Sequence, residues 1–213
     1  MGKESNSDVI GYAERVVSER ETARNEWTVV TNVKKEKVSL NDKHKSNGKG
    51  KVIVLGDSLV KGVGECLEHQ SDMFSSRAYS GLRIEHTETK GTQLGDNPDS
   101  HLILMVGTNN LKSEGSELMA KKYVKVINEA KKHKFRKISV VSILDRTDVG
   151  DLYDSRRLAV NRRLKGICKE NGVDFPWISD VRKHLSRDGL HLNRNGQELV
   201  SSEIFTYCKL YLN

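Results

Sequence analysis

The chain has 213 residues, of which 36% are hydrophobic and 31% are charged, and its formal net charge is +7. This length predicts one domain of ordinary size with an appendage, or two small domains. No apolar run approaches the roughly 18 residues of a membrane span, and residues 1–10 lack the apolar core of a signal peptide. Three scattered cysteines form neither a zinc-ligand set nor a disulfide framework. We therefore expect a protein without a membrane span, located in the cytosol or the nucleus.

Residues 1–50 are predicted to hold an N-terminal helix followed by a basic, flexible linker. The helical pattern covers residues 8–24, but the two heptads there are too few to predict a coiled coil. Residues 32–51 hold seven lysines against two acidic residues, which is +5 of the net charge of +7. We expect the segment from Lys34 to Lys51 to be solvated and flexible.

Two roles are open for this linker. Its lysines could contact the phosphates of a nucleic acid, or the linker could be a solubilising tether. No aromatic residue lies among the lysines, so the bases of a nucleic acid would find no stacking platform there. The residues favour the tether, with nucleic acid as the alternative partner.

From residue 51 onward, apolar strand patterns alternate with amphipathic helical patterns. Strands are predicted at 51–56, 75–81, 101–107, 137–144 and 174–179. Helices are predicted at 59–69, in a short stretch through Ile84, and at 116–133, 154–171 and 196–211. This alternation predicts βαβ units, and hence a three-layer α/β domain over residues 51–213 with a parallel sheet of about five strands.

The first strand ends in Gly-Asp-Ser-Leu at residues 56–59. Ligands of open parallel sheets bind outside the carboxyl ends of the strands, so this tetrapeptide lies where chemistry is expected. The glycines around it fit neither of the two phosphate-binding loop motifs, nor the nucleophile elbow. Two interpretations remain: the Ser58 hydroxyl projects at the mouth of the strand, or Ser58 or Asp57 caps the following helix.

Two further polar motifs lie later in the chain. Asn109 follows the third predicted strand, where its amide could donate to a developing oxyanion or belong to an ordinary polar turn. Asp188 precedes His191 by three residues, a spacing that lets the carboxylate orient the imidazole as a base for a serine. A lone pair of this kind is more often a chance pairing in a surface loop.

Taken in this order on this strand pattern, the motifs resemble those of the SGNH (GDSL-type) hydrolase family. The resemblance implies a flavodoxin-like α/β/α fold and an esterase with a Ser-His-Asp triad. It assigns Ser58 as the nucleophile, His191 as the general base and Asp188 as the orienting acid. It places the oxyanion hole at the backbone N–H groups of Ser58 and Gly81 and at the side chain of Asn109.

The resemblance covers about residues 51–212 and implies cleavage of carboxylic esters, often with short acyl groups, without a metal or an organic cofactor. The expected partner is a small-molecule ester. The chain departs from the family's Gly-x-Asn-Asp pattern, because Asn110 stands where the aspartate is usual. That residue usually supports the loop, so the change puts the rigidity of the loop, and hence the rate, in question.

The layout is also similar to the esterase modules in the first-reading-frame proteins of LINE-type retrotransposons. The similarity lies in the segments WTVV, KVIVLGDSLVKGVGE, HLILMVGTNNL and DGLHLNRNGQ. It implies an alternative function, a weakly active or inactive module that binds nucleic acid or protein. The surfaces expected for such binding are the basic linker and an arginine-rich helix that carries Arg156, Arg157, Arg162 and Arg163.

Overall fold

The computed structural model describes residues 50–211. The expected helix at 8–24 and the linker before residue 50 lie outside these residues. The role of the linker and the domain boundary at residue 50 therefore stay predictions. Within the described part of the chain, no helix combines the length and the apolar character needed to cross a bilayer.

Strands and helices alternate along the described residues, as the apolar pattern predicts. The strands are β1 (Val52–Gly56), β2 (Phe74–Ala78), β3 (His101–Met105) and β4 (Lys137–Val140). The helices are α2 (Leu59–Gln70), α3 (Ile84–Thr92), α4 (Ser116–Lys132), α5 (Asp151–Glu170) and α6 (Arg194–Tyr211), with a short 3-10 helix at Arg182–His184.

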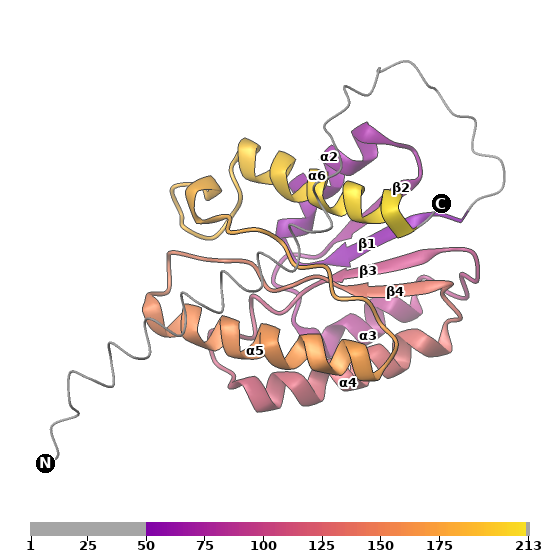
Figure 1. Ribbon diagram of the computed structural model, residues 1–213, viewed down its shortest axis with the longest axis horizontal. Helices are drawn as coiled ribbons and strands as arrows, with labels where there is room; N and C mark the ends of the chain where they lie inside the picture. The colour runs from indigo at the N-terminus through magenta and orange to yellow at the C-terminus, as the bar shows by residue number, and fades with distance from the viewer. Residues whose placement is uncertain (1–49, 212–213) are drawn as a thin grey trace, which may run out of the picture. The chain divides into compact units, whose positions relative to one another are not determined.

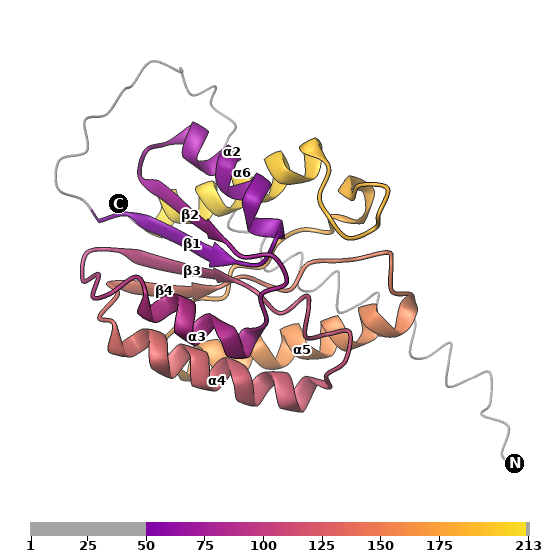
Figure 2. The ribbon, with the colours of Figure 1, turned by 180° about the vertical axis from the view of Figure 1, so that it is seen from behind.

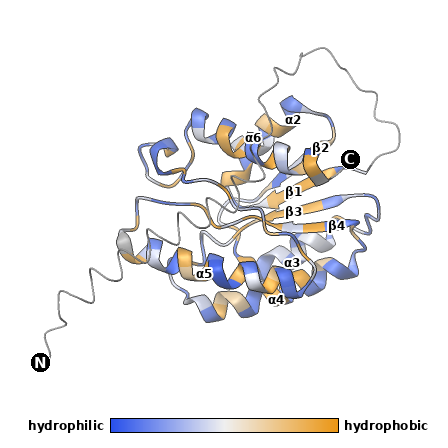
Figure 3. Cartoon of the chain, viewed as in Figure 1, coloured by the Kyte–Doolittle hydropathy of each residue, from blue (hydrophilic) through white to orange (hydrophobic). Residues whose placement is uncertain are grey.

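The strands form one parallel sheet in the order β2-β1-β3-β4. Helices α2 and α6 cover one face of this sheet, and α3, α4 and α5 cover the other (Figure 1, Figure 2). Because both faces are covered, the central strands β1 and β3 are buried along their whole length. Apolar residues accordingly concentrate in the sheet (Figure 3). The architecture is the flavodoxin-like α/β/α sandwich expected from the sequence.

The segment between β2 and α3 differs from the prediction of a strand at 75–81 and a helix ending at Ile84. The strand ends early because the chain turns at Gly81, whose φ of +71° suits glycine. Within this turn the Leu82 N–H donates to the Tyr79 carbonyl (3.1 Å). Helix α3 therefore begins at Ile84 instead of ending there.

The fifth predicted strand, 174–179, forms only in part. Its backbone lies beside β4, where the Val140 N–H donates to the Asp174 carbonyl (2.9 Å) and the Ser142 N–H donates to the Pro176 carbonyl (3.0 Å). Proline has no N–H with which to make the return bond. The ladder therefore stops, an isolated bridge remains at Asp174, and the sheet of the described residues has four strands instead of about five.

Strand β4 also ends before its predicted end, at Val140. Beyond it, side chains supply some of the hydrogen bonds of the backbone, alongside the bonds from Val141 to Leu104 and from Ser142 to Pro176. The Asn161 side chain on α5 accepts the Ile143 N–H (2.8 Å) and donates to the Ile143 carbonyl (3.0 Å). The Ser142 hydroxyl oxygen accepts the Ile178 N–H (3.0 Å). These bonds hold the segment after β4 in place without a regular strand.

A buried polar chain begins at His101, the first residue of β3, whose exposure is 2%. Its Nε2 lies 2.8 Å from the Ser139 Oγ, which in turn lies 2.7 Å from the hydroxyl of Tyr207 on α6. That hydroxyl donates to the carboxylate of Asp174. Burial, together with the nearby charge of Lys137, lowers the pKa of His101 to about 4. The imidazole is therefore neutral in the folded protein near pH 7.

We expect the free energy of unfolding to decrease as the pH falls through the interval between the ordinary pKa of 6.5 and the folded-state pKa of about 4. The reason is that the unfolded chain binds a proton at His101 that the folded chain does not bind. The full loss corresponds to about 3 kcal/mol. Urea unfolding at about pH 7.5 and about pH 4.5 measures most of this loss.

The variant His101→Gln should lose this part of the pH dependence. The exposed His69 on α2 provides a matched control, and His69→Gln should keep the wild-type pH dependence. An unchanged pH dependence in His101→Gln would contradict the prediction.

Candidate active site

The predicted site residues lie at the carboxyl ends of strands or in the loop that precedes the last helix. Ser58 follows β1 and is the N-cap residue of α2. Gly81 follows β2, and Asn109 follows β3. Asp188 and His191 lie in the loop before α6. This loop is on the side toward which the strands point (Figure 1).

Although Ser58 occupies the N-cap position of α2, its side chain does not cap the helix. Its side chain makes no hydrogen bond to the first turn of α2. The neighbouring Asp57 does this instead, since its Oδ1 accepts the Leu59 N–H (3.0 Å). The Ser58 Oγ lies 3.2 Å from Nε2 of His191, a residue 133 positions later in the chain. This geometry favours a projecting hydroxyl over a capping one.

His191 is held between a hydroxyl and a carboxylate. Its Nδ1 lies 2.6 Å from Asp188 Oδ2. Asp188 Oδ1 accepts the backbone N–H groups of Leu190 (3.0 Å) and His191 (2.9 Å). The hydrogen bond from His191 and these two backbone bonds hold the pKa of Asp188 well below its usual value. An ionised carboxylate only accepts hydrogen bonds, so Nδ1 carries a proton, and Nε2 of the neutral ring then has its lone pair toward Ser58.

The loop that carries Asp188 and His191 is docked on the segment after β4. The Thr147 N–H donates to the Gly189 carbonyl (2.8 Å). Gly189 has a φ of +65°, and a Cβ there would lie 2.6 Å from Thr147 Oγ1 and 2.8 Å from the Asp148 nitrogen. The Asp-Gly-Leu-His sequence therefore needs its glycine for a close approach to a distant segment.

The two other predicted oxyanion donors lie together. The Asn109 Nδ2 donates to the Leu82 carbonyl (3.0 Å), which places the amide against the turn that contains Gly81. Gly81 is exposed, and no atom lies within 4 Å of the position of its missing Cβ. Direct contacts thus join the predicted residues in two groups: Ser58, His191 and Asp188 in one, and Asn109 with the Gly81 turn in the other.

Gly107 allows the chain to turn from β3 toward Asn109. It has a φ of +123°, and a Cβ there would overlap the hydroxyl of Tyr123 and lie 2.9 Å from Ile143 Cδ1. The Tyr123 hydroxyl donates to the Val106 carbonyl (2.5 Å) at the end of the strand. A side chain at residue 107 would therefore disturb both the turn and the packing of α4 beneath it.

Two buried charged residues lie near the site: Asp57, which the sequence offered only as a helix cap, and Arg146, which no motif indicated. Asp57 is 2% exposed, and burial raises its pKa to about 6, although Arg146 and His191 act in the opposite direction. Arg146 follows the end of β4, has a side chain with 0% exposure, and is ion-paired with Asp148. Its guanidinium lies 5.4 Å from the centre of the Tyr153 ring. Asp57 directly follows β1, whereas Arg146 lies six residues after the end of β4. The burial of both charges depends on segments that are distant in the chain.

Helix α5 is not a fully exposed arginine surface. Arg157 is 5% exposed and pairs with Asp145 (2.6 Å) and Asp154 (2.7 Å). Asp145 in turn accepts the Val181 N–H (3.4 Å) in the segment leading to the site loop. Arg157 therefore ties internal segments together and, being buried, is not available to the surface that was expected to bind nucleic acid or protein.

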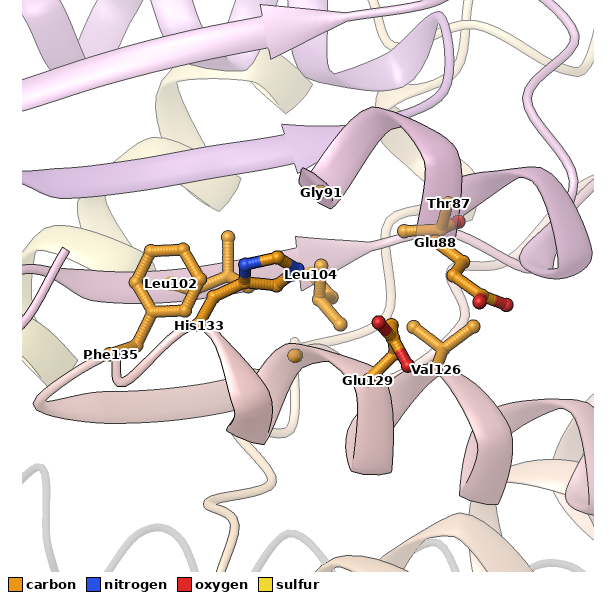
Figure 4. A pocket seen from close by; sticks show the side chains of 10 residues that line it. Thr87, Glu88, Gly91, Leu102, Leu104, Val126, Glu129, His133 and Phe135 are labelled. Atoms are coloured by element: carbon orange, nitrogen blue, oxygen red, sulfur yellow. The ribbon is translucent and has the colours of Figure 1, made fainter. Parts of the chain in front are cut away.

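A small hollow between α3, β3 and α4 is separate from these residues (Figure 4). Its lining consists of Thr87, Glu88, Gly91, Leu102, Leu104, Val126, Glu129, Ala130, His133 and Phe135. None of the predicted site residues belongs to it. Over residues 50–211, no group of three or more His, Cys, Asp or Glu side chains is placed to hold a metal ion.

No family model matches this sequence, and no curated protein matches it. Solved structures do match the fold. A member of the lipolytic G-D-S-L family from Veillonella parvula has a TM-score of 0.65 at 17% identity, covering 76% of this chain and 98% of that one. The psychrotrophic esterase EstA from Pseudoalteromonas sp. has a TM-score of 0.64 at 16% identity, with coverages of 78% and 100%. A mutant acetyl esterase with an acetate ion has a TM-score of 0.61 at 15% identity, with coverages of 76% and 97%.

The fold is that of GDSL-type esterases. At identities of 15–17%, the likeness to these structures is one of fold. The layout of a retrotransposon protein, which the sequence suggested, stays a prediction.

Proposed function

We propose that this protein hydrolyses carboxylic esters, with Ser58 as the nucleophile, His191 as the general base and Asp188 as the orienting acid. One observation carries the proposal. The Ser58 Oγ is not used in helix capping and lies 3.2 Å from His191 Nε2, while His191 Nδ1 lies 2.6 Å from Asp188. In this arrangement the base contacts the serine hydroxyl and the carboxylate contacts the base. Such contacts activate a serine for acyl transfer.

The first half of the reaction transfers the acyl group to the enzyme. His191 Nε2 takes the proton of Ser58 as the Ser58 Oγ attacks the ester carbonyl carbon. The carbonyl oxygen gains the negative charge of a tetrahedral intermediate. As this intermediate collapses, the bond to the alcohol oxygen breaks, and His191 gives its proton to the departing alcohol. The ionised Asp188 stabilises the imidazolium in between.

The second half releases the acid. His191 takes a proton from a water molecule, whose oxygen attacks the acyl-enzyme carbonyl. The second tetrahedral intermediate then expels Ser58, which recovers its proton from His191. In both halves His191 carries the proton between the reacting oxygens.

The oxyanion is proposed to be bound by the backbone N–H groups of Ser58 and Gly81 and by the Asn109 amide. Asn109 Nδ2 carries two hydrogens. One is donated to the Leu82 carbonyl, which fixes the plane of the amide. The other remains available for the substrate oxygen. Gly81 supports the same assignment, since it is exposed and no atom lies within 4 Å of the position of its missing Cβ.

Short acyl groups are the proposed specificity. The support is that structures with this fold include an acetyl esterase with an acetate ion and an acetyl xylan esterase. The proposed substrate class is therefore small acyl esters, with the alcohol side left to a substrate panel.

Labelling with a fluorophosphonate tests the proposal, because this probe phosphonylates only a serine that a base has activated. Wild-type protein should be labelled, with peptide mass spectrometry locating the adduct at Ser58. It should also hydrolyse p-nitrophenyl acetate. Labelling at another serine, or no labelling of folded protein, would overturn the proposed function.

The variant Asn109→Ala is expected to lower kcat about 10²- to 10³-fold with little change in KM, because the donor acts mainly on the charge that develops in the transition state. Initial rates of p-nitrophenyl acetate hydrolysis measure both constants. The exposed Asn195 near the start of α6 offers the matched control, and Asn195→Ala should retain the wild-type kcat. Equal kcat values for the two variants would remove Asn109 from the oxyanion hole.

A further inference from the structure

A compact polar cluster lies between the turn before α3 and the segment that leads into α4. It consists of Arg83, Glu85, Asn110, Glu114 and Lys122, and is called here the Asn110 cluster. Asn110, with an exposure of 0%, lies at its centre, and Glu114 has an exposure of 7%. None of these five side chains belongs to the proposed triad or the proposed oxyanion hole.

Asn110 uses both ends of its amide. Its Oδ1 accepts the backbone N–H of Ile84, the first residue of α3 (2.9 Å). Its Nδ2 donates to Glu85 Oε2 (2.8 Å) and to Glu114 Oε1 (3.0 Å). The side chain therefore joins the segment after β3 to α3 and at the same time supplies hydrogens to two carboxylates.

Two cations complete the cluster. The Lys122 Nζ lies 2.9 Å from Glu85 Oε1 and 2.6 Å from Glu114 Oε1. The Arg83 Nε donates to Glu85 Oε1 (3.1 Å), and its Nη2 pairs with Glu114. Burial acts to raise the pKa of Glu85, but the hydrogen bonds from Lys122, Asn110 and Arg83 outweigh it and lower the pKa to about 2.

The charges of the cluster balance only with a neutral residue at its centre. Glu85 and Glu114 oppose Arg83 and Lys122, and the Asn110 amide adds no charge. An aspartate at residue 110 could still accept the Ile84 N–H, but it would bring a third carboxylate, at a position with 0% exposure, and remove the two donated hydrogens. Unpaired buried charge is costly. The asparagine, which departs from the family pattern, is therefore the residue that this cluster requires.

The Asn110 cluster contacts the two segments that carry Gly81 and Asn109, the residues proposed for the oxyanion hole besides Ser58. Arg83 Nη1 donates to the backbone carbonyl of Asn109 (3.5 Å), and Asn109 Nδ2 donates to the carbonyl of Leu82 (3.0 Å). Gly81 is the residue before Leu82 in the chain. The turn with Gly81 and the segment with Asn109 are thus cross-linked by several polar bonds from distant positions in the sequence.

We propose that the Asn110 cluster positions the oxyanion hole, with Asn110 and Arg83 acting as positioning residues that hold the Gly81 turn against Asn109. This inference rests on the proposed esterase function. A displacement of about 1 Å in such donors lowers the rate by as much as about 10²-fold. Because the cluster does not touch the substrate in this proposal, its loss should lower kcat and leave KM nearly unchanged.

The central test compares Asn110→Asp with the double variant Asn110→Asp/Glu114→Gln, using kcat and KM for p-nitrophenyl acetate. The single variant should lose at least about tenfold in kcat, with KM within about twofold of wild type. The double variant restores the charge balance, and the amide that Glu114→Gln introduces can donate to the new carboxylate. It should recover kcat to within about threefold of wild type, since charges in one network couple strongly.

Two further variants keep the test decisive. Asn128→Asp makes the same substitution at an exposed position of α4 and should leave kcat unchanged. Arg83→Gln changes a partly exposed side chain, so the fold should survive even if Asn110→Asp does not fold. Arg83→Gln should also lose at least about tenfold in kcat, with circular dichroism showing a folded protein.

The outcomes separate the two proposals. An inactive wild-type protein overturns the esterase function and this inference with it. An active wild-type protein with wild-type kcat in folded Asn110→Asp or in folded Arg83→Gln overturns the positioning role alone. A folded single variant that loses kcat, with no recovery in a folded double variant, overturns the charge balance as its cause.

Discussion

Ser58→Ala should lower kcat for p-nitrophenyl acetate by about 10⁴- to 10⁶-fold, because the variant has no nucleophile and every later step depends on the acyl-enzyme. The fold should remain, since the Ser58 hydroxyl makes no capping bond to α2. We therefore expect the free energy of unfolding to change by less than about 0.5 kcal/mol. Initial rates and urea unfolding on the same preparations measure the two quantities.

Ser71 at the other end of α2 gives a crossed control. Its hydroxyl oxygen accepts the Met73 N–H (3.3 Å), so Ser71→Ala should lose about 0.5–1 kcal/mol of stability and keep the wild-type rate. Ser58→Ala should show the reverse pattern. Substantial hydrolysis by purified Ser58→Ala, above that of an unrelated preparation, would mean that another group is the nucleophile.

Asp188→Asn should lower kcat by about 10⁴-fold while leaving the loop in place. The asparagine Oδ1 can still accept the backbone N–H groups of Leu190 and His191 that Asp188 accepts. Its amide, however, would donate toward His191 Nδ1. The proton of His191 would then reside on Nε2, and the ring could not accept the Ser58 proton.

Asp180 provides the matched control for this substitution. Like Asp188, it accepts a backbone N–H two residues later, that of Arg182 (2.9 Å), and it pairs with the side chain of Arg182. Asp180→Asn should therefore disturb the local structure to a similar extent and keep the wild-type kcat. A kcat for Asp188→Asn within about tenfold of wild type would contradict the orienting role of Asp188.

The core strands were predictable because their signal is local. β1 and β3 are short, continuous apolar runs, and such runs occur where helices cover both faces of a parallel sheet. The candidate positions at residues 58 and 109 followed from the same argument, since ligands bind beyond the carboxyl ends of such strands. The elements predicted less well were those whose backbone bonds depend on a neighbour. The fifth strand stops because Pro176 lacks an N–H, and Asn161 on α5 takes over the bonds after β4.

By itself, the sequence determined the order of elements, the α/β/α class and the residues from which a site could be built, because periodicity and motif spacing are properties of short segments. Only the tertiary structure decided that the Ser58 hydroxyl faces His191 and not the first turn of its own helix. The tertiary structure also shows why asparagine suits residue 110, because its amide contacts both Glu114, four residues later, and Glu85 and the Ile84 N–H on the distant helix α3. Burial and charge balance belong to groups that are distant in the chain, and only folding brings those groups together.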